Sequence, residues 1–128
     1  MIASLHGTLH RIYDDGIVVL VSGVGFRVQV PASLINQLGR SGDQVDLYTY
    51  LAVREDSLTL YGFRTEEDRH VFEMLLAVQG VGPRLALSFL NALSPEMLAT
   101  AVQNDEPDVI ARVPGVGKKT AQKVILEL

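Results

Sequence analysis

Hydrophobic residues in the first half of the chain form short runs that alternate with polar residues. Phe26, Val28 and Val30 alternate with Arg27 and Gln29, which is the pattern of a half-buried strand. Gly, Asp and Ser residues separate the runs, which cover Ile2–Leu9, Ile17–Val21, Phe26–Val30, Val45–Val53 and Leu58–Phe63. Five strands with one helical turn at Pro31–Leu38 predict a small closed β barrel, a five-stranded OB-fold, over residues 1–64.

The second half of the chain has the hydrophobic spacing of helices. Val71, Leu75 and Val78 lie on one apolar helical stripe. Capping residues or prolines mark the helix starts, at Thr65, Pro83, Ser94–Glu96, Glu106–Asp108 and Gly117. These signals predict an all-α domain of five helices over residues 65–128, arranged as two helix-hairpin-helix motifs joined by a connecting helix.

One short sequence occurs twice in this helical half. Residues 75–93 read LLAVQGVGPRLALSFLNAL, and residues 110–128 read IARVPGVGKKTAQKVILEL. At an offset of 35 the copies share Val78/Val113, Gly80/Gly115, Val81/Val116, Gly82/Gly117, Ala86/Ala121 and Leu93/Leu128. In each copy a helix ends, Gly-Val-Gly makes a tight turn, and a new helix begins. Free N–H groups and the helix dipole favour an anion there, so two copies predict a nucleic-acid backbone held at two points.

A structural explanation of these turns is that glycine permits a positive φ between packed helices. The duplication and the neighbouring cations favour the binding explanation instead. Cations oppose the dipole at a helix N-terminus, and an external anion resolves that conflict. The predicted DNA-binding residues, which contact phosphates without reading bases, are Gly80, Val81, Gly82, Arg84, Gly115, Val116, Gly117, Lys118, Lys119 and Lys123.

The charge of the chain changes this picture only in part. A formal net charge of −4 over 128 residues argues mildly against nucleic-acid binding, because such domains are often basic. The charges separate within the second half, however, since residues 109–126 contain four basic side chains and no acidic one. A basic face on an acidic body can bind phosphate locally.

Several classes of protein are disfavoured by what the sequence lacks. There are no cysteines, no apolar run of bilayer length and no secretory signal, so we expect a cytoplasmic protein. His6, His10 and His70 have no metal-ligand spacing, and no nucleophile–base set or Walker lysine occurs. We therefore expect no enzyme activity, cofactor or metal. The last helix reaches Leu128 without a cap, and we expect the natural chain to continue.

Glu55 and Asp56 lie at the tip of a predicted hairpin between Val53 and Leu58. Acidic residues are common in turns, and this preference alone is sufficient to explain the presence of the pair. A second alternative is a nuclease site in which the two carboxylates hold Mg²⁺ beside a phosphate. Adjacent residues in a strand turn diverge, and no third carboxylate is close in sequence, which disfavours the nuclease.

Two further features have ordinary structural explanations. Tyr48 and Tyr50 share one strand face and Tyr61 and Phe63 another, and a base-stacking platform is possible there. Half-buried aromatic pairs more often belong to a core or an interface, which we favour. The third Gly-Val-Gly, at residues 23–25, lies between strands and is predicted to be a β-turn.

Taken in order, these motifs resemble the RuvA family over all 128 residues. The resemblance is carried by Met-Ile at 1–2, Gly-Val-Gly-Phe at 23–26, Val-Arg-Glu-Asp at 53–56, Leu-Tyr-Gly-Phe at 60–63, Gly-Val-Gly-Pro-Arg-Leu-Ala at 80–86 and Pro-Gly-Val-Gly-Lys-Lys-Thr-Ala at 114–121. RuvA proteins bind four-way (Holliday) junction DNA in bacterial recombination, repair and the SOS response to DNA damage. They recruit the branch-migration motor RuvB.

The resemblance implies partners and roles that the residues alone do not. It implies a homotetramer, sometimes doubled to an octamer, in which Glu55 and Asp56 form an acidic pin at the junction centre. It implies contact with RuvB through a small C-terminal domain that nothing in this sequence matches, and a further partner in the RuvC resolvase. Two alternatives remain open, namely a general DNA-binding adaptor for duplex or single strands and a protein-interaction scaffold.

Overall fold

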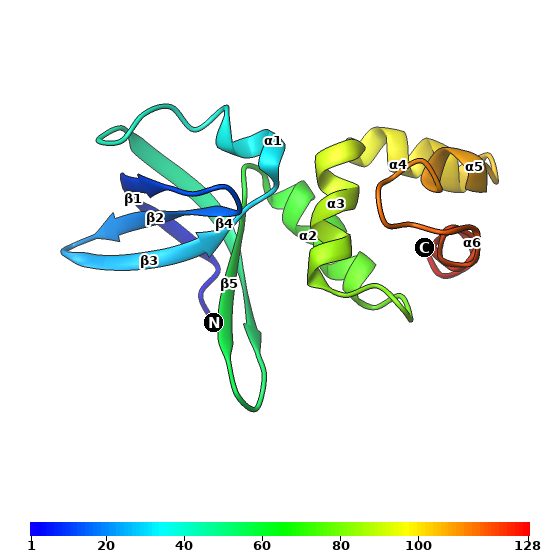
Figure 1. The fold of residues 1–128 in the computed structure, drawn as a ribbon, viewed down its shortest axis with the longest axis horizontal. Coiled ribbons are helices and arrows are strands. Elements are labelled where there is room, and N and C mark those ends of the chain that lie inside the picture. Colours follow the sequence, from blue (N-terminus) through cyan, green and yellow to red (C-terminus); the bar gives the residue numbers. More distant parts are fainter. The chain divides into compact units, whose positions relative to one another are not determined.

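A computed structural model describes residues 1–128, and its contacts divide the chain into two units, Met1–Arg69 and His70–Leu128 (Figure 1). The first unit contains all five strands, which are β1 (Ser4–Ile12), β2 (Gly16–Val21), β3 (Val24–Gln29), β4 (Gln44–Val53) and β5 (Leu58–Phe63). A short helix, α1 (Ala32–Ile35), lies between β3 and β4. This confirms the predicted five strands with one helical insert.

The strands close into a barrel in the order β1-β2-β3-β5-β4. Only the β3–β5 pair is parallel, and the other four pairs are antiparallel. Alternate side chains point inward and form a core that includes Leu9, Ile17, Val19 and Val28, all with no exposed surface. The fold class is therefore the OB-type barrel that the alternating pattern predicted.

The first strand differs from the prediction at its far end. It was expected to end at Leu9, but it continues to Ile12. A bulge between Leu9 and Arg11 inserts His10 as an extra residue, after which Arg11 pairs with Val18. A bulge breaks the two-residue period, so the alternation used to find strands could not follow β1 through it.

The turn between β2 and β3 lies one residue earlier than predicted. Ser22 and Gly23 have φ of 51° and 84°, which is the conformation of a two-residue hairpin turn. Val24 and Gly25 belong to β3, where they pair with Val21 and Leu20. The glycine that the turn requires is therefore Gly23 alone.

Gly62 provides a test of how tightly the barrel is packed. A Cβ at this position would lie 2.6 Å from Val28 Cγ1 and 3.1 Å from Leu47 Cδ1. We expect Gly62→Ala to lower the free energy of unfolding by about 1–3 kcal/mol, because the core must shift to admit the methyl group. Gly25→Ala is the control, since its nearest neighbour would be at 3.3 Å. Equal urea midpoints for the two variants would contradict this packing.

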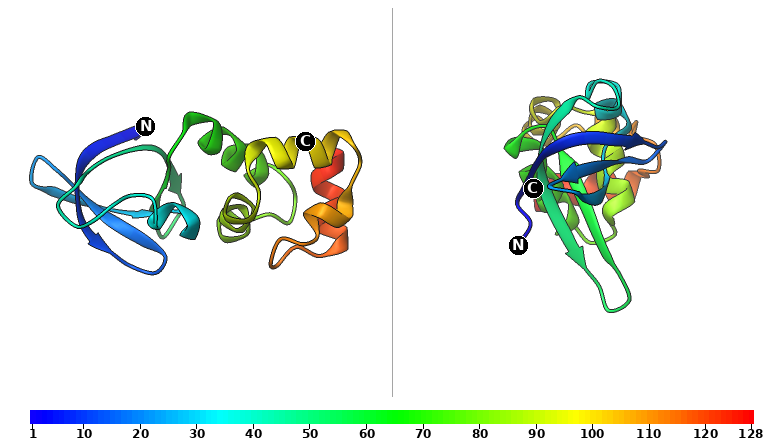
Figure 2. Two further views of the ribbon diagram at one scale, coloured as in Figure 1. Left: turned by 90° about the horizontal axis from the view of Figure 1, so that it is seen from above. Right: turned by 90° about the vertical axis from the view of Figure 1, so that its left-hand side faces the viewer.

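The helical part of the chain contains the five helices that the sequence predicted. They are α2 (Glu66–Leu76), α3 (Pro83–Ala92), α4 (Pro95–Gln103), α5 (Pro107–Ile110) and α6 (Lys118–Glu127) (Figure 2). Proline occupies the first turn of α3, α4 and α5, and the Ser94 side chain accepts a hydrogen bond from the Met97 amide at the start of α4. No single helix has the length and apolar composition to cross a membrane; α3 and α4 meet that test only as a pair bent by 96°.

Candidate nucleic-acid interface

The two glycine turns have the same backbone conformation. Gly80 and Gly115 have φ of 92° and 87°, in the left-handed region that favours glycine. Gly82 and Gly117 are the N-caps of α3 and α6, with φ, ψ of −95°, 178° and −86°, 176°. The sequence repeat is therefore also a repeat of main-chain geometry.

The same hydrogen bonds close both turns. In the first copy, the Val81 amide donates to the Val78 carbonyl at 3.1 Å, and the Ala86 amide donates to the Gly82 carbonyl at 2.9 Å. In the second copy, both equivalent bonds, 35 positions later, measure 3.0 Å. The amides of α3 that precede Ala86, and those of α6 that precede Ala121, have no carbonyl partner within their helices. Each turn thus presents free N–H groups at a helix start.

Val81 and Val116 have a different role from the glycines beside them. Their side chains are 6% and 7% exposed, and their amides are already used inside the turn. They anchor each turn to the helical core, together with Val78 and Val113, which are 2% exposed. A phosphate at either turn would be met by the neighbouring amides rather than by those of the two valines.

The space outside the turns is informative about Gly82 and Gly117. Both have φ values that any residue can adopt, and a Cβ on either would meet no atom of the chain within 4 Å. Gly80 is also open on this side, while a Cβ on Gly115 would lie 3.1 Å from Leu85 Cδ1. Neither conformation nor packing within the chain requires glycine at the two N-caps, so the missing side chains leave room for something outside the chain.

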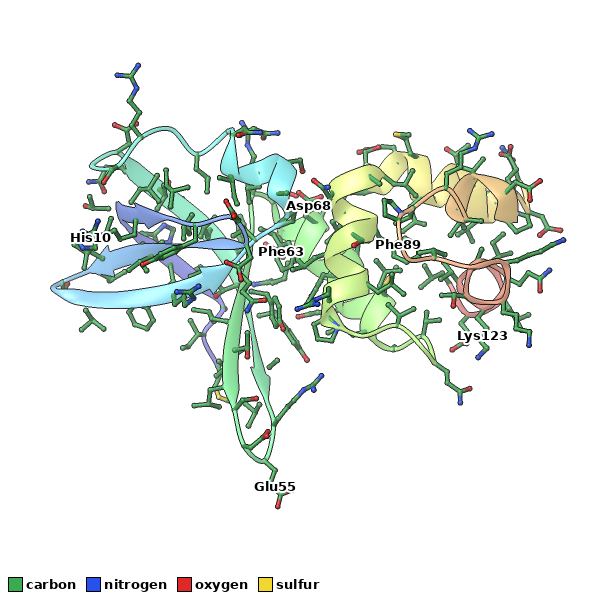
Figure 3. The ribbon with its side chains drawn as sticks, in the orientation of Figure 1. His10, Glu55, Phe63, Asp68, Phe89 and Lys123 are labelled. Carbon is green, nitrogen blue, oxygen red and sulfur yellow. The ribbon has the colours of Figure 1, made fainter.

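The four predicted cations near the glycine turns are all exposed to solvent. Arg84 lies in the first turn of α3, Lys118 and Lys119 begin α6, and all three are exposed. Lys123 is exposed on the same helix, and Figure 3 shows it pointing away from α6. None of the four forms an ion pair within the chain. Their charges remain free for an external anion.

Glu55 and Asp56 lie at the end of the β4–β5 hairpin, in the first unit. The Arg54 amide donates to the Ser57 carbonyl at 2.9 Å and closes the turn, and both acidic side chains are exposed. Figures 2 and 3 show the hairpin extending beyond the rest of the barrel, with Glu55 at its tip. The tip therefore carries two unpaired carboxylates away from the barrel core.

No group of three or more potential metal ligands comes together in residues 1–128. His6 is exposed, and its Nδ1 lies 2.7 Å from Asp46 Oδ1 on the adjacent strand β4. His10, the residue inserted at the bulge, is also exposed. Both histidines therefore lie on the solvent-exposed surface of the barrel unit.

The aromatic residues lie closer together than the sequence indicated. Tyr48 pairs with Phe63 and Tyr50 with Tyr61, so the four side chains share one outer face of the hairpin rather than two. Tyr61 and Phe63 are 7% and 0% exposed, which confirms a packing role for this pair. The Arg69 guanidinium lies 5.7 Å from the Tyr48 ring centroid and donates to the Ala3 carbonyl.

Comparison with known proteins agrees with both halves of this description. Residues 1–62 match the RuvA N terminal domain, and residues 72–128 match the SAM-like helix-hairpin-helix tandem. A protein of Thermomicrobium roseum is 47% identical over all 128 residues, which make up 67% of its length. It is named Holliday junction branch migration complex subunit RuvA. The chain belongs to the RuvA family.

Other RuvA relatives give the same result. A protein of the same name from Symbiobacterium thermophilum is 51% identical over the whole chain, and one from Herpetosiphon aurantiacus is 44% identical. The chain spans about two thirds of the length of these RuvA proteins, 62% and 65% respectively. The family assignment confirms the resemblance, the barrel and the paired helix-hairpin-helix motifs that the sequence predicted.

Proposed function

We propose that this chain binds four-way (Holliday) junction DNA during recombination and repair and holds the junction open for branch migration. The observation that supports this most strongly is the repeated glycine turn. Its two copies have matching dihedral angles and matching hydrogen bonds, and the outer side of each N-cap glycine is empty. This is the geometry that a main-chain phosphate site requires.

In this proposal each turn binds one stretch of sugar–phosphate backbone. Amides near Gly80 and Gly82 and those near Gly115 and Gly117 donate to phosphate oxygens, as anions are bound at helix N-termini. Arg84 adds a cation at the first turn, and Lys118, Lys119 and Lys123 add cations at the second. None of these groups reads a base, so binding depends on DNA shape rather than on sequence.

Selectivity for a branched structure comes from the acidic pin, formed by Glu55 and Asp56. If four copies gather around a junction, two carboxylates from each copy face the crossover. They repel phosphates at the centre while the glycine turns attract phosphates in the arms. A continuous duplex across the centre is therefore disfavoured, and an acidic protein can still bind DNA.

The assembly and the partners belong to the same proposal. Residues 1–64 join copies into a homotetramer, which can double to an octamer, and residues 65–128 bind one arm each. The relatives are named as a subunit of a branch migration complex. We infer that this protein is likewise a non-catalytic cytoplasmic subunit that recruits the RuvB motor and works beside the RuvC resolvase.

A general DNA-binding adaptor is the alternative function. It is favoured by the glycine turns themselves, which need only a phosphate backbone and not a branch. Competition among a four-way junction, a linear duplex and a single strand, at one salt concentration, separates the two functions. The junction function predicts strong preference for the four-way DNA, whereas equal affinities for junction and duplex would favour the adaptor.

Lys118 provides a quantitative test of the phosphate contacts. Lys118→Ala is expected to lower the slope of log affinity against log salt concentration by about one, because one fewer counterion is released. Arg40→Ala removes the same charge from an exposed loop of the barrel unit and is the matched control. Equal slopes for the two variants in a salt titration would show that Lys118 contacts no phosphate.

A further inference from the structure

The β4–β5 hairpin has a feature that the acidic pin does not explain. Val53 and Leu58, which flank the tip, are 60% and 70% exposed, and they form the last cross-strand pair before the turn. Side chains directly opposite in an antiparallel pair lie on one face about 5 Å apart. The two side chains therefore form one continuous apolar surface at the base of the pin.

This apolar surface continues the inside of the barrel into solvent. Val53 follows Leu47, Thr49 and Leu51 at intervals of two, and the first two are 1% and 2% exposed. Arg54 is the first residue of the turn and lies outside β4. On this face β4 and β5 carry only uncharged residues as far as Val53 and Leu58, and the charged residues of the hairpin lie in the turn beyond them.

The strands that carry this surface also stand free of the sheet. Pairing of β1 with β4 ends at Tyr48, and the pairing of β3 with β5 begins at Leu60. Thr49 still donates to the Ala3 carbonyl, but from Leu51 and Thr59 to the tip the two strands are paired only with each other, and Figure 3 shows a narrow projection. A slender hairpin of this kind can enter a gap between DNA strands that a whole barrel cannot.

We propose that Val53 and Leu58 form a contact surface for the nucleobases that are unstacked at the branch point; this rests on the junction binding proposed above. The chemistry of the hairpin selects bases over backbone. Carboxylates at its tip repel phosphates, while an uncharged apolar face suits the faces of bases that have lost a stacking neighbour. The pin separates strands, and the apolar pair holds the separated bases.

The test uses the whole chain and a four-way junction with 2-aminopurine at the branch point, because this base fluoresces more strongly when it is unstacked. The variant Val53→Thr/Leu58→Thr keeps residues that favour strands but removes the apolar surface. Ala52→Ser/Thr59→Ser, on the opposite face of the same hairpin, is the matched control. Circular dichroism and light scattering check the fold and the mass of each protein.

At saturating protein we expect the parent chain and the control to raise the fluorescence equally. The apolar variant should lose about half or more of that rise, while its junction affinity stays within about threefold of the parent value. An undiminished rise in that variant would overturn the inference, as would a fall in its assembly mass, which would place the pair in a contact between copies. If the parent chain itself does not prefer the junction over duplex, the proposed function fails instead.

Discussion

Gly117→Asp is expected to fold as well as the parent chain and to lose junction binding. Aspartate is a preferred N-cap, and its charge is favourable at a helix N-terminus. A Cβ there meets no atom of the chain within 4 Å, so the free energy of unfolding should stay equal or rise. The carboxylate occupies the proposed phosphate position, and its repulsion of about 1–4 kcal/mol predicts a loss of affinity of about fivefold or more.

Ser94→Asp is the control for this variant. It also adds one negative charge at an N-cap, that of α4, where Ser94 already accepts a hydrogen bond from the helix. It lies outside both glycine turns, so its junction affinity should stay near the parent value. Equal affinities for Gly117→Asp and Ser94→Asp, measured by fluorescence anisotropy, would mean that the second glycine turn binds no phosphate.

Glu55→Gln/Asp56→Asn is expected to remove the preference for branched DNA. Without the carboxylates, nothing at the pin repels a phosphate, and a duplex can cross the centre of the assembly. We expect affinity for linear duplex to rise about tenfold, while affinity for the junction is unchanged or rises slightly. The measurement is the ratio of junction affinity to duplex affinity at a fixed salt concentration.

The matched control for the pin is Glu66→Gln/Glu67→Gln. These two acids are also adjacent and exposed, in the first turn of α2, and their neutralisation changes the net charge equally. A rise in duplex affinity that is the same for both pairs would be a general charge effect. The pin would then have no special role in selectivity.

Most of the architecture follows from local sequence signals. Helix starts at Pro83, Ser94 and Pro107 were predicted to within a residue, because capping and proline geometry act over one turn of chain. The glycine turns were predicted for the same reason, and their positive φ at Gly80 and Gly115 is a local property. The barrel followed from alternation in strands that have one face inside.

The structural features that the sequence predicted wrongly all depend on pairing between strands. The bulge at His10 and the shared face of Tyr48, Tyr50, Tyr61 and Phe63 depend on which residues lie opposite each other. A single sequence does not contain that register. The exposure of Val53 and Leu58 was missed for a related reason, because apolar residues in a strand are expected inside, and only the structure places these two beyond the barrel.

The most direct test of the account is the response of the turn amides to junction DNA. Amide resonances of the isotope-labelled assembly should be followed as a four-way junction is added. We predict the largest shifts at the free amides of the two turns, those of Gly82 and Arg84 and those of Gly117 and Lys118, with little change at the start of α4 around Ser94 and Met97. Unshifted resonances at both glycine turns in a saturated complex would contradict the proposal that these turns hold the DNA.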